Sequence, residues 1–159
     1  MMDDAQLVQR CIELARAAAQ RGNAPFGSLI VREGRVVAEG ENSVNTDLDP
    51  TAHAEVVAIR NACRAIGRLD LSGCSLYTSC EPCWICSTAI RETHISRVVF
   101  AAPGPTIGGY SSPHPILREE GIARFGPPPV VVAGVLADRS EALFAEVGWP
   151  RTSAGLPAD

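Results

Sequence analysis

Two short stretches of the sequence carry side chains that could share a metal ion. Residues 51–55 read Thr-Ala-His-Ala-Glu, and residues 79–86 read Ser-Cys-Glu-Pro-Cys-Trp-Ile-Cys. Cys83 and Cys86 are three residues apart, so on a helix they lie on one face and can bind the same ion. A metal of borderline softness accepts imidazole and thiolate together, and His53 with the two cysteines leaves one coordination position open. This donor set is typical of a catalytic zinc site and predicts one Zn²⁺ per chain.

Each half of this pattern has a simpler interpretation. A Cys-x-x-Cys pair can be a redox pair, and an isolated histidine is more often structural than a ligand. A structural zinc needs four such ligands, and no second pair is placed to complete one. A dithiol role would leave His53 and Glu55 without a function. We therefore favour the metal interpretation, in which Glu55 is the catalytic residue that moves protons.

Both stretches are expected to open helices. Asp49 is a candidate cap for the first helix, and Ser79 or Glu81 for the second. Helix N-termini carry partial positive charge, which favours the thiolates that zinc requires. On an ideal helix, residues two apart point to roughly opposite sides. His53 and Glu55 can therefore flank one pocket only if His53 lies at the frayed start of its helix.

Hydrophobic periodicity and turn residues predict the elements that must position these side chains. A helix ends near residue 20, and strands at 26–31 and 36–40 form a hairpin around Glu33–Gly34. The remaining expected elements are a helix over 51–66, a strand at 75–78, the cysteine helix to about 92, strands at 97–101 and 130–135, a short helix around 116–124, and a last helix with a capping box at Asp138 and Glu141. The tail from Pro150 is expected to be mobile. This order predicts an α/β sheet with helices on both faces and the site at one end.

Composition limits the classes of protein that remain. The chain has 159 residues, of which 46% are hydrophobic and 20% charged, as in an ordinary single globular domain. No apolar run approaches the ~20 residues that span a bilayer, and acids stand where a signal peptide would be positive. We therefore expect no membrane association, a cytoplasmic location and reduced cysteines. The formal net charge is −4 and arginines are scattered among acids without any lysine, which argues against a nucleic-acid partner.

Residues 25–99 resemble the cytidine and deoxycytidylate deaminase superfamily, nearest the branch of guanine deaminases and bacterial tRNA adenosine deaminases. The resembling segments are residues 24–31, 39–42, 49–55 and 80–86, and His-x-Glu followed about thirty residues later by Pro-Cys-x-x-Cys is the specific part. The resemblance implies a three-layer α/β/α cytidine deaminase-like fold with a five-stranded mixed sheet. It implies that residues 1–159 form a single zinc-dependent deaminase domain. Zinc would then be held by His53, Cys83 and Cys86, with Glu55 as proton shuttle.

The same resemblance implies how the substrate is held. Asn42 would hydrogen-bond the base, Phe26 would line the pocket, and the backbone of Ala54 would touch the substrate. A turn role for Asn42 and a plain core role for Phe26 remain open, since buried aromatics often simply pack. Members of this branch are commonly homodimers, so self-association is expected.

The expected function is hydrolytic deamination of an amino-substituted nucleobase or nucleoside, with a free purine such as guanine as the leading substrate. Glu55 would take a proton from the attacking water and return protons to the ring nitrogen and the departing ammonia. The alternatives are a tRNA adenosine deaminase, which the acidic charge argues against, a deaminase of cytosine or another heterocycle, and an inactive zinc-binding scaffold of the same fold.

Two features depart from the family pattern. Trp84, directly after the first cysteine, is larger than expected and could crowd the pocket or pack in the core or at an interface. Residues 108–115 are unfamiliar, and their length and place suit a specificity loop. Tyr110 and His114 could contact substrate there, and a surface role for both remains open.

Overall fold

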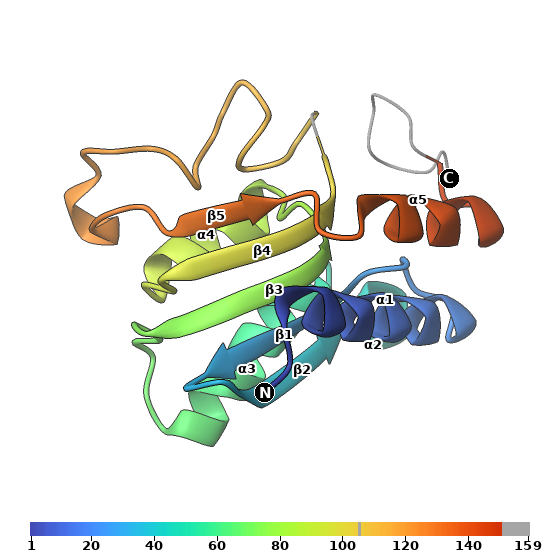
Figure 1. The fold of residues 1–159 in the computed structure, drawn as a ribbon, viewed down its shortest axis with the longest axis horizontal. Helices are drawn as coiled ribbons and strands as arrows, with labels where there is room; N and C mark the ends of the chain where they lie inside the picture. The colour runs from blue at the N-terminus through green and yellow to red at the C-terminus, as the bar shows by residue number, and fades with distance from the viewer. Residues whose placement is uncertain (105, 151–159) are drawn as a thin grey trace.

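The computed structural model describes residues 1–104 and 106–150, which contain a five-stranded sheet with helices on both of its faces (Figure 1). The elements in chain order are α1 (Asp4–Gln20), β1 (Gly27–Arg32), β2 (Arg35–Glu41), α2 (Val44–Asp47), α3 (Ala54–Ile66), β3 (Cys74–Cys80), α4 (Trp84–Glu92), β4 (Arg97–Ala102), the 3₁₀ helix η1 (Ala123–Phe125), β5 (Val130–Ala133) and α5 (Ala137–Glu146). Among the described residues, no helix is long and apolar enough to cross a membrane.

The sheet is mixed, in the order β2-β1-β3-β4-β5. Strand β1 is antiparallel to both β2 and β3, whereas β3, β4 and β5 run parallel. The β1–β2 hairpin turns at Glu33 and Gly34, whose φ angles of 51° and 73° match the twist that short hairpins require. The prediction of a five-stranded mixed α/β sheet is confirmed.

Alternating side chains of the strands supply two separate hydrophobic layers, as the twofold repeat of a strand requires. Ile30, Leu76 and Val98 pack with the buried residues of α3 and α4. Leu29 and Tyr77, one position away along their strands, pack with those of α1 and α5. The result is a three-layer α/β/α arrangement. It places the N-termini of α3 and α4 on the same side of the sheet.

The ends of the helices agree only in part with the sequence expectation. Helix α1 begins with a capping box between Asp3 and Gln6. The capping box predicted for the last helix is wrong, because α5 begins at Ala137, after a left-handed residue and without a side-chain cap. The short helix predicted around 116–124 is reduced to the 3₁₀ turn η1. The tail beyond Pro150 lies outside the described residues.

Candidate metal centre

Helix α3 begins one residue after His53, which adopts the extended conformation of an N-cap (φ −66°, ψ 151°). The predicted cap at Asp49 is wrong because its carboxylate accepts hydrogen bonds from the backbone and hydroxyl of Thr51, which closes a local turn. His53 is therefore outside the helical repeat. Its ring can share a pocket with Glu55, which lies in the first turn and is buried.

Helix α4 begins in the same way, with Cys83 as an extended N-cap before Trp84. Neither predicted cap is used. Ser79 belongs to strand β3, and its hydroxyl accepts a hydrogen bond from the backbone of Gly27. The carboxylate of Glu81 accepts hydrogen bonds from a distant segment. Both site helices therefore place a residue of the metal-binding cluster at the N-cap, and at α4 the backbone dipole favours the anionic sulfur of Cys83.

The three predicted ligands converge. Nδ1 of His53 lies 3.4 Å from Sγ of Cys83 and 3.4 Å from Sγ of Cys86, and the two sulfurs are 3.7 Å apart. Tetrahedral zinc with its usual bond lengths places two sulfurs about 3.8 Å apart, and a sulfur and a nitrogen about 3.6 Å apart. The observed spacings fit that geometry. All three residues lie within reach of one metal ion, and both cysteines are free of disulfides.

The electrostatics of the cluster also suit a cation. The Cys86 thiol donates to the Cys83 sulfur, and this hydrogen bond, with that from His53, lowers the pKa of Cys83 to about 4. The same bond to Cys83, together with burial, raises the pKa of Cys86. The bond between His53 and Cys83 raises the pKa of His53. Binding of a metal by both sulfurs requires the proton on Cys86 to leave, so metal affinity should rise with pH.

Glu55 lies against this cluster with its carboxylate buried. Oε1 accepts a hydrogen bond from the hydroxyl of Thr78 at 3.0 Å. Oε2 lies 3.3 Å from Sγ of Cys86, whose one thiol proton is shared between this oxygen and the Cys83 sulfur. Burial, followed by the negative charge of Cys83, raises the pKa of Glu55. A buried carboxyl beside this cluster lies within reach to take up and return a proton.

Backbone hydrogen bonds join Asn42 and Phe26 to each other and join the residue after Asn42 to the segment that carries His53. The amide of Asn42 donates to the carbonyl of Phe26, and the amide of Ser43 donates to the carbonyl of Ala52, next to His53. Ala54 is fully buried at the first position of α3.

The structure shows a local packing or turn role for both Asn42 and Phe26, and their contacts with substrate stay predictions. Asn42 is 4% exposed and its Oδ1 caps the backbone of Val44, but its Nδ2 donates no hydrogen bond within residues 1–104 and 106–150. Phe26 packs edge-on against Phe144 and Trp149, with ring centroids 5.7 and 5.5 Å apart. Phe144 and Trp149 lie beyond the part of the chain that carries the motifs, so their packing against Phe26 could not be predicted from those motifs.

Glu81 has a structural role that was not predicted from the sequence. It is buried, and its two oxygens accept hydrogen bonds from the backbones of Gly104, Tyr110 and Ser111 and from the Ser111 hydroxyl. Gly108 forms an isolated β-bridge with Cys83. A Cβ at position 108 would overlap the Glu81 carboxylate, so only glycine fits there. In the sequence, the only sign of a special role for Glu81 was its place between Cys80 and Pro82, and that place suggested a helix cap.

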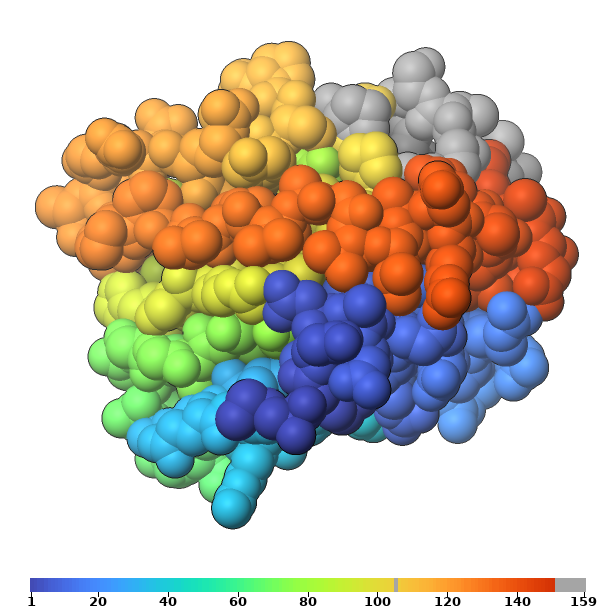
Figure 2. Space-filling view, viewed as in Figure 1, coloured from blue at the N-terminus to red at the C-terminus, as the bar shows by residue number. Residues whose placement is uncertain are grey.

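The Glu81 bonds fix the beginning of the segment between β4 and β5, which forms the upper left edge of the molecule in Figure 2. Trp84 donates through its ring nitrogen to Ser112 and packs edge-on against His114. Tyr110 packs against Phe100 of the sheet. Trp84 and His114 therefore contact each other within the chain, and Tyr110 contributes to the hydrophobic layer under α3 and α4.

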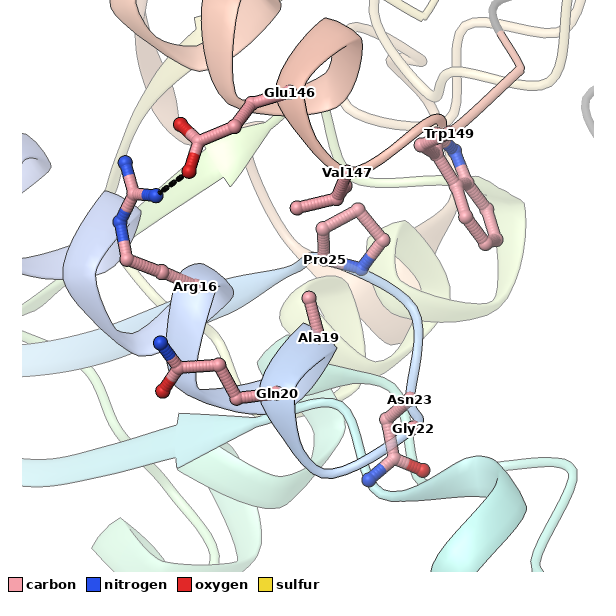
Figure 3. Close-up of a pocket in the computed structure, with 9 residues that line it drawn as sticks. All are labelled: Arg16, Ala19, Gln20, Gly22, Asn23, Pro25, Glu146, Val147 and Trp149. Atoms are coloured by element: carbon pink, nitrogen blue, oxygen red, sulfur yellow. Dashed lines mark hydrogen bonds and ion pairs between the residues drawn. The ribbon is translucent and has the colours of Figure 1, made fainter.

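Two hollows on the surface are separate from the metal ligands. The first, of about 360 Å³, lies between the C-terminal ends of α1 and α5, with the ion pair of Arg16 and Glu146 on one side and Trp149 on the other (Figure 3). The second, of about 370 Å³, lies between α1 and the end of β2. Neither hollow is lined by His53, Cys83 or Cys86.

The fold and the site together define an α/β/α protein with an open His-Cys-Cys zinc site. Residues 1–102 match the model of the cytidine and deoxycytidylate deaminase zinc-binding region. The chain belongs to the cytidine and deoxycytidylate deaminase family, and His53, Cys83 and Cys86 are the cluster of its zinc-binding region.

Individual relatives include two kinds of deaminase. The chain is 46% identical to the guanine deaminase of Bacillus subtilis over 102 residues, which are 64% of this chain and 65% of that protein. It is 43% identical to the tRNA-specific adenosine deaminase of Aquifex aeolicus over 105 residues, 66% of this chain and 70% of that one. A solved structure in complex with 2,6-diaminopurine matches with a TM-score of 0.79 and 25% identity, covering 96% of this chain and 85% of that chain.

Proposed function

We propose that the protein is a zinc-dependent hydrolytic deaminase whose substrate is a free purine base such as guanine, and that residues 1–159 form one deaminase domain. The observation that carries this proposal is the buried Glu55 carboxylate, 3.3 Å from the Cys86 sulfur of a ligand set spaced for tetrahedral zinc. Water would replace the ring amino group, so the products are ammonia and a ring carbonyl.

Each site residue has a defined part in this reaction. His53, Cys83 and Cys86 would hold zinc, which would supply the Lewis acidity that makes water a stronger nucleophile near neutral pH. Glu55 accepts a proton from the attacking water and gives it to the ring nitrogen. It then accepts the remaining proton of the added hydroxyl and gives it to the leaving amine. This back-and-forth transfer requires a carboxyl within hydrogen-bond reach of the reacting groups, which agrees with the place of Glu55 beside the cluster.

A purine is supported by the residues around the metal ligands and by the relatives. Asn42 presents a donor that is unpaired within the described residues, and an oxygen or nitrogen acceptor on the edge of a base would satisfy it. Phe26, directly before β1, accepts a hydrogen bond from the backbone of Asn42, directly after β2, and brings an aromatic ring next to that residue. One relative is a guanine deaminase, and one solved structure holds a diaminopurine.

Deamination of adenosine in tRNA is the second candidate, favoured by the 43% identity to the Aquifex aeolicus protein. The formal charge of −4 and the absence of lysine work against it, because binding of a phosphate backbone depends on a basic surface. We also expect a homodimer on the basis of the family resemblance. Light scattering would show twice the mass of one chain if this is correct.

The decisive experiment is ammonia release by the zinc-loaded protein from guanine, adenine, cytosine, pterins, triazines, their nucleosides and an RNA anticodon hairpin. We expect turnover of guanine or another free purine, and loss of that turnover in Glu55→Gln. Reaction of the hairpin with no reaction of any free base would contradict the purine proposal. No reaction with any compound by a fully zinc-loaded protein would contradict the deaminase proposal itself.

A further inference from the structure

Thr78 is a buried polar residue that the reaction described above does not use. It lies in the central strand β3 between Ser28 of β1 and Phe100 of β4, and its side chain is fully buried. Its hydroxyl donates to Oε1 of Glu55 at 3.0 Å. A buried hydroxyl requires a hydrogen-bond partner, and the partner of Thr78 is the Glu55 carboxylate, which is proposed to move the protons.

The bond from Thr78 is the one expected to persist when metal is bound. Within the described residues, the carboxylate of Glu55 accepts hydrogen bonds from two other side chains, Thr78 and Cys86. Cys86 must lose its proton to ligate a metal, and it then has nothing to donate. The Thr78 hydroxyl keeps its proton. Oε1 then keeps its hydrogen bond from Thr78, and Oε2 lies next to the sulfur of Cys86 without a protein donor among the described side chains.

We propose that Thr78 is a positioning residue that fixes the orientation of the Glu55 carboxylate, so that Oε2 alone exchanges protons with the reacting groups. This inference rests on the proposed deaminase function. Its physical basis is that proton transfer requires the donor and acceptor atoms within hydrogen-bond reach, and that small misplacements of a catalytic group reduce rates strongly. Thr78 acts through Glu55.

The strand makes Thr78 a rigid support. It is paired on both sides in the middle of the sheet, and a β-branched side chain has few χ1 conformations open to it. The hydroxyl is therefore held in place by the backbone and by its own branching. A serine at this position would keep the donor and lose part of that restriction.

The experiment compares Thr78→Val with Thr78→Ser in zinc-loaded protein. Valine has nearly the shape of threonine without the hydroxyl, and serine has the hydroxyl without the methyl group. We expect Thr78→Val to lower kcat at least about tenfold with KM changed less than about twofold, and Thr78→Ser to stay within about threefold of the wild type. Zinc content should be equal in all three proteins.

A second measurement does not depend on activity. Crystal structures of the zinc-loaded proteins should show the Glu55 carboxylate in one orientation in the wild type and Thr78→Ser, and rotated or in several orientations in Thr78→Val. If Thr78→Val is not recovered as folded protein, Thr78→Ser and Thr78→Ala form a second pair that differs by the hydroxyl oxygen.

Three results would overturn the role of Thr78: kcat of Thr78→Val within about threefold of the wild type, equal losses of kcat in Thr78→Val and Thr78→Ser, or an unchanged Glu55 carboxylate in the Thr78→Val crystal. A wild-type protein that deaminates none of the compounds tested would refute the proposed function instead. The orientation of the carboxylate would then still decide whether Thr78 positions Glu55.

Discussion

Replacing Glu81 by glutamine should release the segment that follows β4. In the wild type, Oε1 accepts from the backbones of Tyr110 and Ser111 at 3.0 and 2.7 Å, and Oε2 accepts from the backbone of Gly104 and the hydroxyl of Ser111 at 2.9 and 2.7 Å. Glutamine has one acceptor oxygen. If the glutamine oxygen takes the place of Oε1, the glutamine amide nitrogen faces the N–H of Gly104. Two hydrogen-bond donors then point at each other.

The expected loss in the free energy of unfolding follows from these four hydrogen bonds. Leaving the Gly104 N–H unpaired costs about 1–3 kcal/mol. The two bonds that remain on the amide oxygen become neutral ones, roughly half as strong, which adds about 1 kcal/mol. We therefore expect Glu81→Gln to lower the free energy of unfolding by about 3 kcal/mol, equivalent to about 6–12 °C in Tm for a chain of this length.

The assay is urea unfolding of zinc-loaded protein, in which the transition midpoint should fall with little change in the m-value. Hydrogen exchange should show that the amides of Gly104, Tyr110 and Ser111 lose protection. Glu120→Gln is the matched control, because it removes the same charge from an exposed residue and should change stability by less than about 0.5 kcal/mol. If Glu81→Gln is as stable as this control, our account of the Glu81 bonds is wrong.

Three further predictions follow from the site and the fold. Glu55→Gln should keep one zinc per chain by metal analysis and lose at least about a hundredfold in kcat, and normal turnover would remove Glu55 from the mechanism. Zinc at one hundred times its Kd should raise the free energy of unfolding by about 2.7 kcal/mol over chelator-treated protein, whereas equal stabilities would speak against a native metal site. The Arg97 guanidinium lowers the pKa of Asp4 below 3.8, so the stability from this pair is complete above pH 3.8 and disappears as the pH falls through the lowered value. Urea unfolding should therefore show Asp4→Asn less stable than the wild type at neutral pH and equal to it in acid, and a difference that persists in acid would contradict this sign.

The sequence identified the metal ligands and most of the sheet because both depend on local patterns. The cysteine spacing and the His-x-Glu motif are readable within a few residues, and the strands show runs of apolar residues. The two site helices begin later than the sequence predicts, at Ala54 and Trp84. Asp49 and Ser79 have the chemistry of caps, but each found another partner, Thr51 in a local turn and Gly27 on the neighbouring strand.

The segment between β4 and β5 could not be predicted, because its conformation depends on partners far away in the sequence. Glu81 binds its beginning, and the buried guanidinium of Arg91 donates to the carbonyls of Ile116, Glu119 and Gly126 further along. Thr78 was missed for the same reason, since only the fold brings its hydroxyl to Glu55. In each case the residue type was compatible with several local roles, and a long-range hydrogen bond selected one.

X-ray absorption spectroscopy of the purified protein tests the central claim most directly. We predict one zinc per chain with two sulfur ligands at about 2.3 Å and two nitrogen or oxygen ligands at about 2.0–2.1 Å, one of them from His53. Cys83→Ser should lose one sulfur from the spectrum and most of the metal. A protein without zinc, a site with four sulfurs, or a disulfide between Cys83 and Cys86 would contradict the account.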